Sequence, residues 1–82
     1  MNPQTPSMSD IALAAAQKRV EVTARNFKII ARGLIRLEQM DVSRDVVEEQ
    51  ARCLAEAGEK FRIAVRVLNT TRRINGVDPA NP

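Results

Sequence analysis

Two stretches of nearly equal length repeat apolar and small residues in alternating steps of three and four, with a short turn around Asp41 between them. This spacing keeps one side of a helix directed toward a partner helix. We expect the first helix over residues 10–40 and the second over residues 44–75. Because a short connection makes two helices antiparallel neighbours, the pattern predicts an all-α fold, an antiparallel two-helix hairpin.

The positions at these steps form the seam along which the two helices are expected to pack. Its large apolar residues are Leu13, Val20, Phe27, Ile30, Leu34 and Leu37 in the first helix, and Val47, Leu54, Phe61 and Leu68 in the second. Its smaller or polar members are Ala16, Thr23, Gln50, Ala57, Ala64 and Thr71. If the numbers of facing residues sum to about 84, large side chains mostly meet small ones, as dense packing requires.

Charged residues indicate the same register. A basic stripe runs along the first helix at Arg25, Lys28, Arg32 and Arg36. The same alignment brings three acidic residues opposite this stripe, at Glu48, Glu56 and Glu59. It also brings Arg52 against Arg32, which have like charges. Glu49 is expected to pair with Arg52 and offset this repulsion. Exposed ion pairs contribute only about 0 to 1 kcal/mol each, so these charges select the register more than they stabilise the fold.

Local signals set the ends of the helices. A capping-box pattern at Ser7–Asp10 and a candidate N-cap at Ser43 mark the two starts, and Asn75 with Gly76 marks the second end. We therefore expect an N-terminal tail over 1–8, a hairpin domain over 9–76 and a C-terminal tail over 77–82. Gly33 could split the first helix; the competing explanation is a close approach of the second helix at Ala51, and we expect a continuous helix.

The seam leaves many apolar residues without a predicted partner. They lie wholly or partly off it, at Ile11, Val22, Ile29, Ile35, Val46, Ile63, Val65, Val67 and Ile74. Two helices that touch along one seam bury little surface for a chain of 82 residues. We therefore expect self-association into a helical bundle, or docking onto other helical proteins of an assembly. The predicted partner-facing residues are Ile29, Ile63, Val67 and Ile74.

The residue content argues against catalysis. The chain has no histidine, which is the commonest general base and a common metal ligand. It has no glycine-rich phosphate loop, and its acidic residues follow helical charge patterns. The one cysteine, Cys53, is interpreted as a small buried apolar residue, with a nucleophile or redox sensor as the alternative. We expect no enzyme activity, no cofactor and no metal.

Two further classes of partner receive less support. A basic face at Arg62, Arg66 and Arg73 could bind an acidic protein or nucleic acid, although the net charge is only +3 and no aromatic residue outside the seam is available for base stacking. A solvated basic helix end is the alternative explanation. No run of about 18 apolar residues and no signal peptide is present, so we expect no membrane insertion and a cytoplasmic location as synthesised.

Both helices resemble the terminal helices of one protein family. Residues 11–30 carry an Ala-Ala-Gln, basic, apolar, acidic, Ala-x-Asn-apolar progression at Ala15, Ala16, Gln17, Arg19, Val20, Glu21, Val22, Ala24, Asn26 and Phe27. Residues 41–72 carry a Val-Glu segment, a small-residue and aromatic centre and an apolar-Leu-Asn-Thr ending at Val47, Glu48, Glu49, Ala57, Phe61, Ala64, Val67, Leu68, Asn69 and Thr70. This order of residues is similar to that of bacterial flagellar rod and hook proteins.

The resemblance implies a function in assembly. In that family the terminal helices pack together and against neighbouring subunits to form a tubular axial structure. This chain has a turn around Asp41 where the family has an intervening β-rich region. The resemblance implies a minimal structural component of the flagellar basal body, with no catalytic residue. The alternative is a small cytoplasmic four-helix-bundle dimer that acts as an adaptor or regulator through the basic face.

Overall fold

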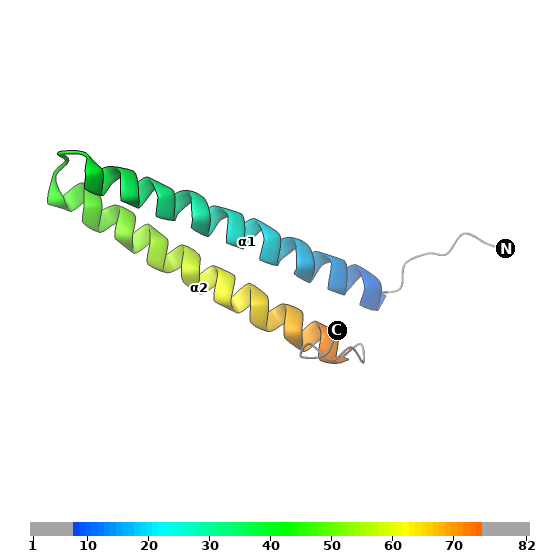
Figure 1. Cartoon of the computed structure of the whole chain (residues 1–82). Coiled ribbons are helices and arrows are strands. Elements are labelled where there is room, and N and C mark those ends of the chain that lie inside the picture. The colour runs from blue at the N-terminus through cyan, green and yellow to red at the C-terminus, as the bar shows by residue number, and fades with distance from the viewer. Residues whose placement is uncertain (1–7, 75–82) are drawn as a thin grey trace.

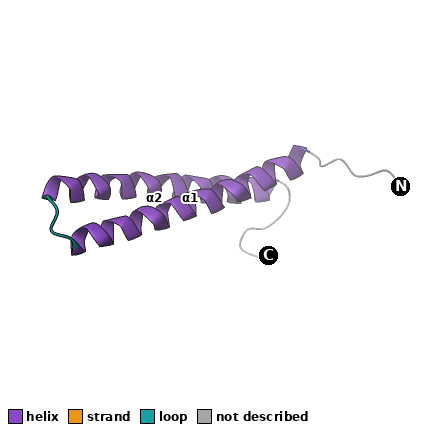
Figure 2. Cartoon of the chain, turned by 90° about the horizontal axis from the view of Figure 1, so that it is seen from above, coloured by secondary structure: helices purple, strands orange, loops and turns teal. Residues whose placement is uncertain are grey.

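The computed structural model describes residues 8–74 and consists there of two long helices, α1 (Met8–Gln39) and α2 (Arg44–Ile74), with no strand. The helices lie side by side along their length and run in opposite directions, so both described ends of the chain are at the end away from the turn (Figure 1). A view turned by 90° shows the same pair joined by a single short loop (Figure 2). The predicted all-α antiparallel hairpin is confirmed.

The loop between the helices is closed by backbone hydrogen bonds. The Met40 N–H donates to the carbonyl oxygens of Arg36 and Leu37 at 3.1 and 3.2 Å, which ends α1. The Ser43 carbonyl oxygen accepts the first bonds of α2, from the N–H groups of Val46 and Val47. Ser43 therefore occupies the predicted N-cap position. The expected cap residues Ser7, Asn75 and Gly76, and nearly all of both tails, lie outside the described residues.

Gly33 lies inside a continuous α1, as expected, but its neighbour on α2 is Gln50. The Gln50 Nε2 atom donates a hydrogen bond to the Ile30 carbonyl oxygen at 3.2 Å, and a Cβ atom at position 33 would lie 2.9 Å from this nitrogen. Ala51, the residue expected opposite Gly33, is exposed. The neighbour differs from the expected one by one residue, because adjacent helical side chains point about 100° apart and, of Gln50 and Ala51, it is Gln50 that contacts α1.

The seam is narrow and filled by small residues. Every residue predicted for it is buried or half-buried, and the most buried are Ala16, Ala57, Ala64 and Leu68. A Cβ atom at Gly58 would lie 3.1 Å from Cε1 of Phe27, so this aromatic ring packs against a position without a side chain. No large side chain within residues 8–74 is fully buried. The hairpin alone therefore has a thin core.

The expected ion pairs between the helices do not form. Each of the four ion pairs described within residues 8–74 joins residues three or four apart on one helix: Lys18–Glu21, Arg44–Glu48, Arg52–Glu49 and Arg62–Glu59. The expected ion pair of Arg52 with Glu49 is present, with 2.9 Å between Arg52 Nη1 and Glu49 Oε2. Arg25 and Arg32 are offset from the seam by about half a turn, so their side chains face away from α2.

Candidate docking surface

A groove of about 300 Å³ opens between the two helices near the middle of the hairpin. α1 contributes Thr23, Asn26, Ile29 and Ile30 to its lining, and α2 contributes Cys53, Glu56, Ala57 and Lys60. Thr23, Ile30 and Ala57 belong to the seam and form the inner part of the groove. The other five lining residues flank the seam and form the rim of the groove. The groove combines an apolar interior with one acidic and one basic side chain.

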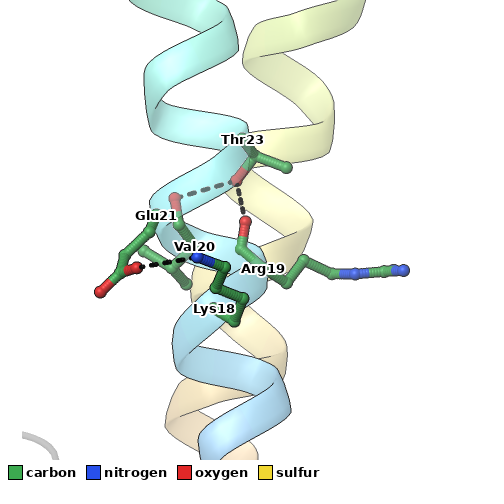
Figure 3. A network of polar contacts seen from close by, with 5 residues as sticks. All are labelled: Lys18, Arg19, Val20, Glu21 and Thr23. Atoms are coloured by element: carbon green, nitrogen blue, oxygen red, sulfur yellow. Dashed lines mark hydrogen bonds and ion pairs between the residues drawn. The ribbon is translucent and has the colours of Figure 1, made fainter.

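The polar seam residues satisfy their hydrogen bonds within the hairpin. The Thr23 hydroxyl donates to the carbonyl oxygen of Arg19 at 2.7 Å and is also 3.2 Å from that of Val20 (Figure 3). Thr71 repeats the first arrangement with the carbonyl oxygen of Val67 at 2.8 Å. Because the Thr23 hydroxyl is already bonded to its own helix, it does not require a polar ligand in the groove.

The exposed apolar residues gather on the side of the hairpin where the groove opens. On α2, steps of seven from Cys53 and Lys60 lead to Val46, Val67 and Ile74, and Ile63 lies three residues after Lys60. On α1, a step of seven back from Ile29 leads to Val22. Residues spaced in this way share one side of a helix. We call this surface the groove face; its exposed branched apolar residues are Val22, Ile29, Val46, Ile63, Val67 and Ile74.

All four residues predicted to face a partner lie on the groove face. Ile29 is 59% exposed, Ile63 and Val67 are each 45% exposed, and Ile74 is 78% exposed. The structure adds Val22 and Val46 to them, together with the groove itself. The signal for these additions is the seven-residue spacing, which becomes informative only when the two helices are placed side by side.

The opposite side of the hairpin has a different composition. Near the seam it carries the small residues Ala24, Ala31 and Gly58, and further out it carries charged residues that include Glu21, Lys28 and Glu48. Ile35 is its large exposed apolar residue, at 56%, and Ile11 lies on the outer side of α1. Exposed apolar surface is therefore concentrated on one face.

The predicted basic face is partly neutralised by its own helix. The Arg62 guanidinium donates two hydrogen bonds to the Glu59 carboxylate, at 3.1 and 2.7 Å. This bidentate contact and the positive charges of Arg62 and Arg66 hold the pKa of Glu59 below its ordinary value. The same contact and the negative charge of Glu59 raise the pKa of Arg62. Arg66 and Arg73 are exposed on the outer side of α2.

The described residues show no arrangement for other kinds of site. Within residues 8–74, no group of three or more histidine, cysteine, aspartate or glutamate side chains is placed to hold a metal ion. Cys53 is half-buried at the groove and forms no disulfide there. Neither α1 nor α2 reaches the apolar length that a membrane crossing requires.

Comparison with known proteins gives no relative: no protein-family model, no curated protein and no solved structure matches this chain. The resemblance to flagellar rod and hook proteins therefore rests on the two helical segments alone. The groove face is the feature of the hairpin that most directly indicates a binding function.

Proposed function

We propose that this protein is a non-catalytic assembly protein that acts by helix–helix self-association through its groove face. One observation carries this proposal: within residues 8–74 only three alanines and Leu68 are buried, while six branched apolar side chains stay exposed on one side of the hairpin. Water contact with such a face costs free energy that burial against another helical surface recovers.

The size of the groove face fits a protein interface. A helix of 32 residues is about 48 Å long, and two helices in contact are about 18 to 20 Å wide. Their common face therefore covers roughly 900 Å², close to the roughly 800 Å² per partner of a standard specific interface. A second hairpin of the same dimensions would cover it along its whole length.

The flagellar resemblance offers one setting for this activity. There the hairpin would act as a minimal structural component of the basal body, with its groove face packed against the terminal helices of neighbouring subunits. An axial assembly grows by head-to-tail contacts, which need two different surfaces on each copy. The concentration of exposed apolar residues on one face gives more support to a closed bundle than to an open polymer.

The second candidate function is that of a bundle-forming adaptor that binds an acidic protein or nucleic acid. The exposed side chains of Arg66 and Arg73 support it, because they lie on the outer side of α2 and remain accessible when the groove face is covered. The ion pair of Arg62 with Glu59 reduces the charge that this face offers. Such binding would weaken steeply as salt is added.

Molar mass in solution tests the proposal and separates its two settings. Light scattering after size exclusion, over a hundredfold range of protein concentration, should give a self-associated species. A fixed mass near 18 kDa, twice the 9.1 kDa of one chain, supports the closed bundle. A mass that grows steadily with concentration supports the axial assembly. A mass of one chain at every concentration overturns self-association.

A further inference from the structure

Charge is distributed unequally along the hairpin. The half away from the turn, residues 8–25 and 60–74, holds eight basic and two acidic residues. The half that contains the turn, residues 26–59, holds five basic and seven acidic residues. Two copies laid side by side in the same direction would bring the two basic halves together. Two copies laid in opposite directions bring each basic half against an acidic half, which is electrostatically favourable.

The rim of the groove carries one charge of each sign. Glu56 and Lys60 lie four residues apart on α2 and both line the groove. Neither takes part in the four ion pairs that the structure describes within residues 8–74. If an apolar surface covered this groove, both charges would lose water and would need partners of opposite sign.

We infer that the occupant of the groove face is a second copy of this chain, laid antiparallel across it, with Glu56 of each copy paired with Lys60 of the other. This inference rests on the self-association proposed above. The two pairs are related by a two-fold axis that passes level with residue 58 of α2. The hairpin register, in which facing residue numbers sum to about 84, brings Asn26 of α1 to the same level.

The same axis matches exposed apolar residues to the groove. Cys53 lies five residues before residue 58 and Ile63 five after it, so Ile63 of one copy meets Cys53 of the other. On α1, Val22 and Ile30 are each four residues from Asn26, so Val22 of one copy meets Ile30 of the other. Cys53 and Ile30 line the groove, whereas Ile63 and Val22 are exposed beside it. The face is therefore complementary to itself under this symmetry.

A closed pair also follows from the presence of one apolar face. When both copies use the same surface, the two-fold contact covers both faces and leaves no equivalent surface for a third copy. The outer side of α2, with Arg66 and Arg73, stays outside this contact.

Charge reversal followed by mixing tests the pairing. In Glu56→Lys, both pairs across the axis become lysine with lysine, and in Lys60→Glu both become glutamate with glutamate. We expect each variant to dimerise at least tenfold more weakly than the original chain, as measured by light scattering. In an equimolar mixture, each of the two contacts between the variants joins a lysine of one to a glutamate of the other. The mixture should therefore form a heterodimer near 18 kDa, twice the mass of one chain, and recover any helical signal lost by either variant alone.

Matched controls reverse the same charges away from the groove face. Glu21→Lys and Lys28→Glu should dimerise like the original chain, because both positions lie on the side of the hairpin opposite the groove face. If the original chain is monomeric, the proposed function itself fails. If it dimerises but either groove variant dimerises equally well, or the mixture does not form a heterodimer, the antiparallel pairing is wrong and the proposed self-association stands.

Discussion

Phe61 and Ile63 lie two residues apart on α2, but they lie on different surfaces of the hairpin. Phe61 is half-buried in the seam against α1, whereas Ile63 is 45% exposed on the groove face. Both surfaces are apolar, and only the seam has its partner within the chain. Apolar content alone therefore does not define the core of this small helical protein, because part of it stays exposed on the groove face that we propose as an interface.

The largest effect is expected from a charge placed in the seam. Phe61→Asp removes a large aromatic side chain and puts a carboxylate against α1, where its desolvation is unfavourable. We expect a loss of about 3 kcal/mol or more, which would unfold a hairpin with so thin a core. The helical circular dichroism signal at 25 °C measures this. If Phe61→Asp kept the original helical signal and melting temperature, the assignment of Phe61 to the seam would be wrong.

A smaller effect is expected at the edge of the seam, from Gly33→Ala. Alanine favours a helix over glycine by about 1 kcal/mol. The new Cβ atom would displace the Gln50 amide, the mobile end of a long side chain, from its bond to the Ile30 carbonyl oxygen. We expect thermal melting to show a stability gain of up to about 1 kcal/mol. A loss larger than this would show that the Gln50 bond holds the helices together.

The smallest effect is expected on the outer side of α2, which belongs to neither surface. The pKa of Glu59 is lowered in the folded state by its hydrogen bond from Arg62, so the pair stabilises the fold above the ordinary pKa of glutamate. This stabilisation is lost as the pH falls through the lowered pKa. Glu59→Gln should therefore melt slightly earlier than the original chain at pH 7 and at the same temperature at pH 2. A difference that persisted at pH 2 would contradict the charge-based explanation.

The sequence was sufficient to predict the hairpin and only part of its groove face. The spacing of the seam residues predicts each helix, and the short turn predicts that the two helices are antiparallel neighbours. Both signals are local, because each depends on one segment or on two consecutive segments of the chain. The ion pairs were harder to predict. Glu48 and Glu59 have basic residues within reach on their own helix, Arg44 and Arg62, and these local pairs form in place of the expected pairs with α1. Their formation does not depend on the register of the two helices.

The groove face depends on both helices at once, so the pattern of either helix alone predicts only part of it. Ile29, Ile63, Val67 and Ile74 were predicted to face a partner because they lie off the seam. The same criterion also selected Ile35, which lies on the opposite side. Only the placement of the two helices shows that Ile29 and Cys53 border the same groove.

Ile63 and Ile35 provide the most direct test of whether the groove face is the docking surface. Both are exposed isoleucines, at 45% and 56%, and only Ile63 lies on the groove face. The measurement is molar mass by light scattering, for Ile63→Asp and Ile35→Asp at a concentration where the original chain is associated. We expect Ile63→Asp to remain helical at the mass of one chain, and Ile35→Asp to keep the mass of the associated form. Equal masses for the two variants would contradict the assignment of the groove face as the docking surface.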